Sequence, residues 1–217
     1  NSVLFDGPGG TLVVDTGRHV EHTRALLEAT APAGPAAVLV THWHLDHLGG
    51  VALLRAERPG LQVLGSDAIA PALVGWLARS RAEMQAMLDA GPDPAMQRLL
   101  RIDLALIDAG ARLRPDVVVD APRILDRIGR PLHLGVARHA VTAADLWVWD
   151  PATRVLAAGD LVTFPVPFLD TACPDGWRSA LERIGALPFE RLVPGHGPVL
   201  DRAGFQAWRA AFDGLLA

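Results

Sequence analysis

Short hydrophobic runs separated by turn residues open the chain. Two runs on either side of Gly-Pro-Gly-Gly predict a hairpin of two strands, and two later continuous apolar runs predict buried strands. Apolar residues at helical spacing before Pro32, and again over residues 51–57, predict helices between these strands. The predicted strands are residues 3–5, 11–15, 37–40 and 61–64. The first third of the chain therefore mixes strands and helices.

Residues 67–111 carry apolar positions spaced near three and four, which predicts an inserted helical segment broken at Gly91-Pro92. Strands return in the second half, with helices around residues 177–184 and from about residue 202. The predicted strands there are residues 117–119, 124–125, 132–134, 146–149, 155–158 and 191–193. This order predicts an α/β fold in which two sheets face each other with helices outside.

Composition narrows the kind of protein. With 217 residues, half of them hydrophobic, the chain can bury a full core, and we expect a single domain over residues 1–217. A net charge of -4 without a basic cluster argues against a nucleic-acid partner. No run reaches the roughly 18 apolar residues that span a bilayer, so we expect a soluble protein of the cytoplasm or periplasm. The single cysteine, Cys173, cannot form an internal disulfide.

The stretch THWHLDHLGG, residues 41–50, concentrates coordinating side chains directly after a predicted buried strand. If the backbone stays extended there, His42 and His44 project to the same side and can share a metal ion. Asp46 and His47 follow as the chain turns toward the next helix, so they can face a second metal position. One segment can thus supply ligands to two neighbouring sites.

Each ion still needs ligands from elsewhere, and three candidates lie just beyond predicted strands, where loops gather functional residues. His139 follows one strand, Asp160 ends another in Ala-Gly-Asp, and His196 lies in Pro-Gly-His-Gly. The seven candidate metal ligands are His42, His44, Asp46, His47, His139, Asp160 and His196.

The pattern His42-x-His44-x-Asp46-His47, with later His139, Gly159-Asp160 and Gly195-His196-Gly197, resembles the metallo-β-lactamase superfamily over essentially the whole chain. The resemblance implies an αββα sandwich with a dinuclear metal site at one edge, and two zinc ions as cofactors, with iron as the other possibility. The implied ligands are His42, His44 and His139 for the first ion, Asp46, His47 and His196 for the second, and Asp160 as the bridge.

The sequence departs from the family pattern at the middle histidine. In many relatives this residue opens a short His-Thr-x-Gly-Asp or His-Thr-x-Gly-Ser turn, whereas the stretch from His139 to Asp145 is two residues longer. His133 is the nearby competitor, but it lies inside a predicted strand, so we prefer His139.

The charge of such a site favours a particular chemistry. Two zinc ions carry four positive charges, and Asp46, Asp160 and a bridging hydroxide return three, which leaves the site near plus one. This charge favours a small-molecule substrate with an anionic group or a polarised carbonyl. Zinc lowers the pKa of bound water toward about 7, so we expect the hydroxide to attack the carbonyl, with Asp46 as both ligand and orienting residue.

Family patterns narrow the reaction class. Asp160 stands where many lactam-hydrolysing members carry Cys or Ser, and the absence of Tyr argues against acyl-homoserine-lactone hydrolases. What remains resembles glyoxalase II-like hydrolases, or metallohydrolases associated with quinoprotein or sulfur-oxidation systems, acting on a thioester, ester or lactone. Two alternatives stay open: an iron enzyme of the persulfide dioxygenase type, with two His and one Asp on the iron, and a metal-binding protein without turnover.

For two further segments the sequence allows two alternative roles each. The inserted helices form either a lid or a contact surface, and we expect Trp76, Met84 and Met87 to pack within them. Residues 164–177 directly follow the Asp160 strand and either line the substrate mouth or pack as a loop, which we prefer.

Overall fold

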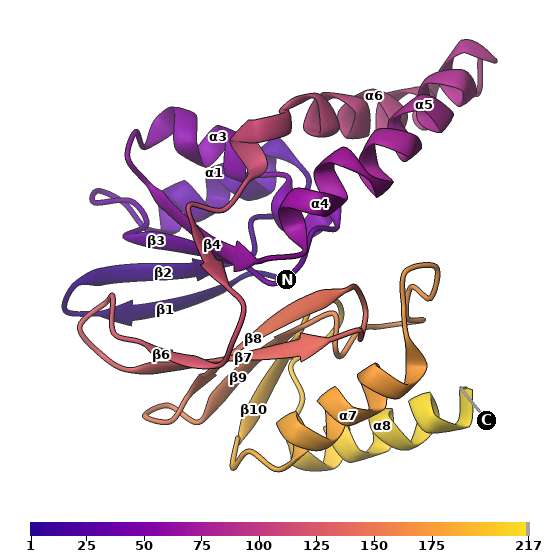
Figure 1. The fold of residues 1–217 in the computed structure, drawn as a ribbon. Helices are drawn as coiled ribbons and strands as arrows, with labels where there is room; N and C mark the ends of the chain where they lie inside the picture. Colours follow the sequence, from indigo (N-terminus) through magenta and orange to yellow (C-terminus); the bar gives the residue numbers. More distant parts are fainter. Residues whose placement is uncertain (216–217) are drawn as a thin grey trace.

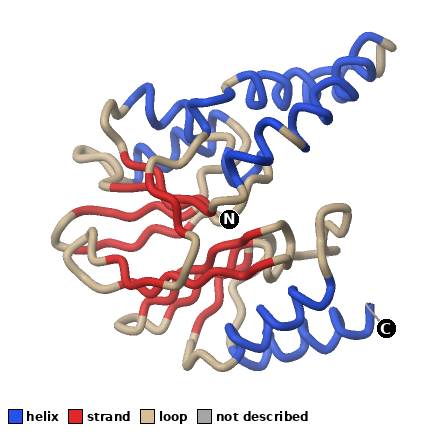
Figure 2. Tube along the Cα trace, viewed as in Figure 1, coloured by secondary structure: helices blue, strands red, loops and turns tan. Residues whose placement is uncertain are grey.

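The computed structural model describes residues 1–215 and consists of two sheets that face each other (Figure 1). Strands occupy the centre and helices lie on the two outer sides (Figure 2). The strand orders are β1-β2-β3-β4-β5 in the first sheet and β10-β9-β8-β7-β6 in the second. This arrangement confirms the αββα sandwich expected from the sequence.

The first sheet begins with the predicted hairpin, in which β1 and β2 pair antiparallel, and continues with three parallel pairings. Its strands are β1 (Val3–Gly7), β2 (Gly10–Val14), β3 (Ala37–Val40), β4 (Gln62–Ser66) and β5 (Val117–Val119). The helices between them are α1 (Val20–Ala29), α2 (Leu45–Leu48) and α3 (Val51–Glu57). Parallel pairing with intervening helices places the ends of β2, β3 and β4 at one edge of the sheet.

β3 shows why a continuous apolar run is needed at the centre of the sandwich. Ala37 and Leu39 pack into the core between the sheets, whereas Val38 and Val40 pack against the outer helices. Side chains alternate between the faces of a strand, so a strand covered on both faces is apolar at every position. The chain emerges from this buried strand directly into Thr41 and His42.

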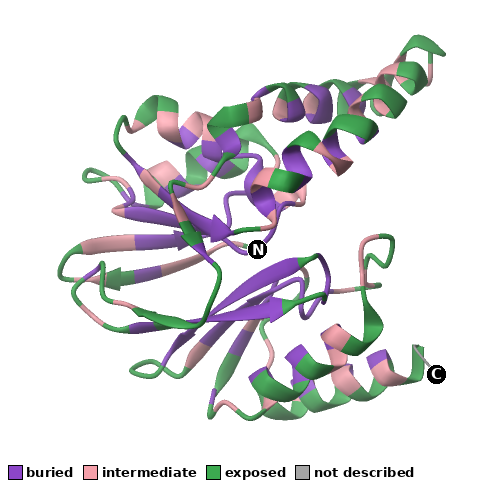
Figure 3. Ribbon diagram, viewed as in Figure 1, coloured by how far each residue is buried: buried purple, intermediate pink, exposed green. Residues whose placement is uncertain are grey.

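The inserted segment is a set of helices that projects beyond the sheets (Figure 1). It comprises α4 (Ile69–Val74), α5 (Trp76–Asp89), α6 (Pro94–Asp108) and the short 3-10 helix η1 (Gly110–Leu113). The break falls at the predicted place, where Gly91 has a φ of 70°. Asp93 then caps α6 by accepting hydrogen bonds from the backbone N–H groups of Ala95 at 2.9 Å and Met96 at 3.1 Å. The far end of the α5–α6 hairpin is largely exposed (Figure 3).

The second sheet is mostly antiparallel, with a parallel pairing between β9 and β10. Its strands are β6 (Arg123–Leu125), β7 (Leu132–Arg138), β8 (Ala144–Asp150), β9 (Val155–Gly159) and β10 (Arg191–Pro194), and its helices are α7 (Pro174–Gly185) and α8 (Arg202–Leu215). β7 is longer than the predicted strand over residues 132–134, because its pairing with β8 continues to Arg138 and Ala144. A tight hairpin therefore stands where the sequence indicated a loop.

Three apolar clusters hold the layers together. One lies between the sheets, and the other two join each sheet to its outer helices. In the second outer cluster, the fully buried Trp177 of α7 packs on Phe212 of α8 with ring centroids 4.8 Å apart. Among residues 1–215, no helix has both the length and the apolar character needed to cross a membrane.

Candidate metal centre

Six of the seven candidate ligands lie together, in two groups whose ligand atoms are within 4.8 Å of one another. One group contains His42, His44 and Asp160, and the other contains Asp46, His47 and His196. The loop after β3 and helix α2 supply the members from residues 42–47, and the loops after β9 and β10 of the second sheet supply the rest. The site therefore lies where the two sheets meet.

Two glycines allow Asp160 to approach the first sheet. A Cβ on Gly159 would lie 2.9 Å from the Thr41 Cβ, and Gly159 also has a φ of 54° that other residues rarely adopt. A Cβ on Gly195 would lie 1.8 Å from Asp160 Oδ1. A larger side chain at Gly195 would therefore displace the Asp160 carboxylate, and one at Gly159 would press against Thr41.

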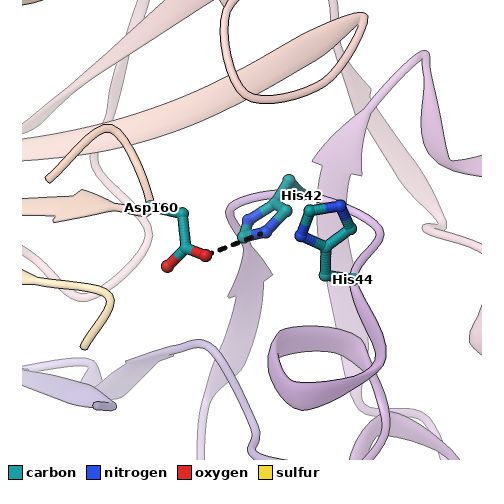
Figure 4. A group of neighbouring side chains, drawn as sticks. All are labelled: His42, His44 and Asp160. Atoms are coloured by element: carbon teal, nitrogen blue, oxygen red, sulfur yellow. Dashed lines mark ion pairs between the residues drawn. The ribbon is translucent and has the colours of Figure 1, made fainter. Parts of the chain in front are cut away.

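The first group places two imidazoles and one carboxylate around a common point (Figure 4). His42 Nε2 lies 3.8 Å from Asp160 Oδ2, which is too long for a hydrogen bond. The rings of His42 and His44 have centroids 4.5 Å apart and are nearly perpendicular. Their spacing fits convergent ligands better than a packed ion pair.

The second group is tighter. His196 Nε2 lies 2.8 Å from Asp46 Oδ2, and His47 Nε2 lies 3.3 Å from His196 Nε2. Asp160 connects the groups, because its Oδ1 lies 3.2 Å from His47 Nε2 while its Oδ2 faces His42. This is the position that a bridging carboxylate needs.

Two buried atoms of the site have no hydrogen-bond partner among the described residues: His42 Nε2 and Asp160 Oδ1. Asp160 Oδ1 is close to His47 Nε2, but the contact does not meet hydrogen-bond geometry. A buried unpaired polar atom costs about 1–3 kcal/mol, so such atoms call for a partner. A cation is a suitable one, because both atoms carry lone pairs and carboxylate and imidazole are common zinc ligands.

The two carboxylates of the site are held in their charged form. Burial would raise the pKa of Asp46, but hydrogen bonds from His196 and His47 outweigh it and place the pKa far below its usual range. Burial likewise opposes ionisation of Asp160, and the positive charge of His47 holds its pKa below the usual range. Both are therefore anionic at neutral pH, as metal ligands must be.

The histidines differ in their proton affinity. Burial lowers the pKa of His42 well below its usual value and lowers that of His44 to about 4, so both are neutral at pH 7. Burial would also lower the pKa of His47, but the charges of Asp160 and Asp15 raise it well above the usual range. Metal binding at His47 therefore has to displace a proton.

Asp15 contacts residues of both ligand groups, and the sequence analysis missed it. Its Oδ2 lies 2.8 Å from His47 Nδ1 and accepts a 2.8 Å hydrogen bond from Thr41 Oγ1, which in turn lies 3.0 Å from His42 Nδ1. A carboxylate only accepts hydrogen bonds, so both imidazoles are held with Nδ1–H outward and Nε2 toward the site. The sequence does hold a signal for Asp15: it is an acidic residue immediately after the buried strand β2, at the sheet edge that carries His42.

His44 is oriented by a different partner. Its Nε2 lies 3.2 Å from Thr171 Oγ1, which donates a 2.8 Å hydrogen bond to the Val141 carbonyl. Thr171 Oγ1 therefore accepts from His44 Nε2–H, which leaves Nδ1 of His44 for a metal.

His139 stays outside both groups, which differs from the expectation that it completes the first one. It lies at the turn of the β7–β8 hairpin with a φ of 50°, and its N–H donates to the Ala143 carbonyl at 3.1 Å. This turn exposes His139 and buries Val141. The competitor His133 is also exposed, on β7, and belongs to neither group.

A cavity of about 460 Å³ opens on the two groups. Its lining includes four of the six grouped residues together with side chains from α5, α6 and the segment after β9. Trp76 and Met84 line this cavity, whereas Met87 is 51% exposed on the surface of α5. The inserted helices thus form one wall of the site, and part of residues 164–177 forms another.

Comparison with known proteins gives a family match over most of the chain and sequence matches to curated proteins over shorter stretches. The pattern of the Metallo-beta-lactamase superfamily matches residues 1–196. Hydroxyacylglutathione hydrolase of Erwinia tasmaniensis is 44% identical over 62 residues, which are 29% of this chain and 24% of that protein. The same-named protein of Xanthomonas campestris pv. campestris is 41% identical over 66 residues, 30% of this chain and 24% of that protein. The chain thus spans about a quarter of the length of these curated relatives.

Solved structures show the same fold at low identity. A metallo-beta-lactamase from Pontibacter korlensis has a TM-score of 0.66 at 22% identity, with 94% of this chain and 83% of that chain covered. TMB-1 has a TM-score of 0.71 at 16% identity, with 100% and 86% covered. Together with the match over residues 1–196, the two-sheet fold and the grouped His and Asp residues, these likenesses show that the chain belongs to the metallo-beta-lactamase superfamily.

Proposed function

We propose that this protein is a dinuclear zinc-dependent hydrolase of a thioester, ester or lactone. The observation that carries the proposal is the pair of ligand groups that meet at Asp160, with His42 Nε2 and Asp160 Oδ1 buried and unpaired between them. The partial likeness to hydroxyacylglutathione hydrolases supports a thioester among the candidate substrates.

The donor set suits catalytic rather than structural zinc. His42, His44 and Asp160 would hold one ion, and Asp46, His47 and His196 the other, with Asp160 shared between them. The first ion would have three protein ligands and a position open to water or substrate, as catalytic zinc usually does, whereas the second would have four, counting the shared Asp160. Bound zinc supplies Lewis acidity and lowers the pKa of water to about 7.

The chain's own residues prepare the reaction. Asp46 lines the cavity, so its carboxylate can accept a hydrogen bond from the attacking water and orient it toward a substrate carbonyl. Asp15 fixes the tautomers of His42 and His47, and Thr171 fixes that of His44. A substrate that covers the apolar cavity walls would displace water from around the carbonyl, which would strengthen the electrostatic contacts there.

A second candidate function follows from the composition of the first group. Two histidines and one carboxylate, as in His42, His44 and Asp160, are also the ligand set of mononuclear iron oxygenases. Such an enzyme would consume oxygen with a persulfide substrate, whereas the hydrolase would not consume oxygen at all.

The test is hydrolysis by protein purified with its native metal. Aryl esters, acyl thioesters and lactones should be hydrolysed, a chelator should abolish the activity, and added zinc should restore it. Asp46→Asn should lower kcat by at least about a hundredfold, because the orienting carboxylate and one metal ligand are altered together. Oxygen uptake without hydrolysis would favour the iron enzyme, and full activity of Asp46→Asn would contradict the assigned role.

A further inference from the structure

The bottom of the cavity is formed by residues of the two metal-ligand groups, and we call it the floor. His44, Asp46, Asp160 and His196 all contribute to its lining. A molecule in this cavity therefore reaches the atoms to which the proposed function assigns catalysis. The remaining lining residues decide which substrates can enter.

One wall is aromatic and apolar. Trp43 and Trp76 have ring centroids 5.0 Å apart, and the Trp43 ring lies 4.7 Å from the His44 ring. Met84, two turns further along α5, extends this surface. A flat or branched hydrocarbon group can rest on this wall while its carbonyl faces the floor.

The opposite wall comes from the segment after β9. The Phe168 ring lies edge-on to His44 at 5.3 Å, although 43% of Phe168 remains exposed. Val166 beside it is 68% exposed. Each apolar Å² removed from water contributes about 25 cal/mol, so an apolar ligand group gains affinity by covering these side chains.

Charge is nearly absent outside the metal-ligand groups. The charged residues there are Arg18 and Asp103, and they neutralise each other. Arg18 Nε lies 2.6 Å from Asp103 Oδ1, and Arg18 Nη2 also contacts Asp103 Oδ2, which makes a bidentate pair. A carboxylate on the part of the substrate that extends away from the metal-ligand groups would have to break this pair to find a cation.

Resting on the proposed function, we infer that the substrate carries a bulky, uncharged apolar acyl group, aromatic or branched, which lies between the Met84 and Phe168 walls. Hydrolysis adds water across the acyl bond: a C–O bond forms, the C–S or C–O bond breaks, and the thiol or alcohol leaves with a proton. A glutathione thioester is a poor fit, because its two carboxylates meet no unpaired cation in this cavity.

The direct test compares acyl groups on one uncharged thiol. With protein that retains its native metal, kcat/KM for the phenylacetyl thioester of N-acetylcysteamine should exceed that for the acetyl and succinyl thioesters by at least about tenfold. It should also exceed kcat/KM for phenylacetyl-glutathione. Preference for the acetyl, succinyl or glutathione compounds would overturn this inference alone, whereas no hydrolysis of any compound would overturn the proposed function as well.

Two methionines on the same helix provide a matched pair of variants. Met84 lines the cavity, and Met87 is 51% exposed and outside it. Met84→Ala should lower kcat/KM for the phenylacetyl thioester by about tenfold and leave the metal content unchanged. Met87→Ala should leave both unchanged. Equal effects of the two substitutions would show that the wall does not contact the acyl group.

The Arg18–Asp103 pair allows a variant that should improve the turnover of an anionic substrate. Asp103→Asn removes the charge that neutralises Arg18 but keeps the size of the side chain. Its kcat/KM for the succinyl thioester should rise about tenfold relative to that for the phenylacetyl thioester. An unchanged ratio would mean that the pair does not decide substrate charge.

Discussion

Among the grouped residues, His196 is a suitable one to remove, because its loss should change the metal centre without disturbing the core. Its side chain is 41% exposed and lies 2.8 Å from Asp46 Oδ2, so it can be removed without opening the core. His196→Ala should therefore lower the metal content by about one ion per chain and reduce turnover by at least about a hundredfold. Elemental analysis of the purified variant, alongside unfolding midpoints, checks this expectation.

His139→Ala is the control for that variant. His139 is exposed and outside both groups, so its removal should leave metal content and turnover unchanged. If His139→Ala loses an ion, the ligand set that the sequence resemblance implied would be right in solution.

Asp15 should act on metal affinity through His47 and His42. Asp15 has a φ of 62°, which Asn also tolerates, so Asp15→Asn keeps the backbone while it removes the charge. Loss of such a supporting carboxylate typically weakens metal affinity about 10–100-fold. Competition with a chelator measures this shift, and the exposed Asp6→Asn provides a control. Equal affinities of the two variants would contradict the positioning role.

Residue chemistry explains which members of the two groups were predictable from the sequence. The residues of the segment 42–47 share one short stretch, and Asp160 and His196 each follow a strand beside glycine. The sequence cannot show which residue a hairpin turn buries, and here the turn buries Val141 and exposes His139. Asp15 acts through hydrogen bonds to residues 26 and 32 positions away, and local sequence does not reveal these.

At the scale of elements, β8 carries a buried carboxyl. Burial raises the pKa of Asp145 to about 7, against the opposing hydrogen bonds from Thr142 N at 3.0 Å and Thr142 Oγ1 at 2.9 Å. In the unfolded chain the pKa of this carboxyl is about 3.9. At a pH between the two pKa values, folded Asp145 therefore holds a proton that unfolded Asp145 has lost. The free energy of unfolding should therefore fall as pH rises from about 4 to 7.

Asp145→Asn tests this pH dependence in metal-depleted protein. The fall in unfolding free energy between pH 5 and pH 8 should be smaller in the variant, by a few kcal/mol at most. Urea denaturation at both pH values provides the measurement, with the exposed Asp126→Asn as a matched control. The same pH dependence in all three proteins would show that Asp145 titrates normally.

Element types followed the sequence closely because their signals are local. The ten predicted strands and the break at Gly91 all appear in the structure. The sequence did not predict the full length of β7. This strand continues to Arg138 because its pairing with β8 continues to that residue. Strand pairing of this kind is a tertiary property, so hydrophobic runs alone cannot define its end.

For the whole molecule, we propose that residues 1–217 form one cooperative domain, because the central cluster takes side chains from both sheets. Trp177 is fully buried, and its indole N–H donates to the Leu161 carbonyl at 2.9 Å. Trp177→Ala should lower the free energy of unfolding by about 3–5 kcal/mol and shift one single transition. Tryptophan fluorescence and circular dichroism should report the same midpoint. Two separate transitions, with only one shifted, would indicate two domains.

The central claim is a metal centre with two positions, and metal content per chain tests it most directly. Elemental analysis should be made on protein purified without added metal or chelator. The two ligand groups that meet at Asp160 predict close to two zinc ions per chain. Close to one iron per chain, or no bound metal after incubation with zinc, would contradict the account.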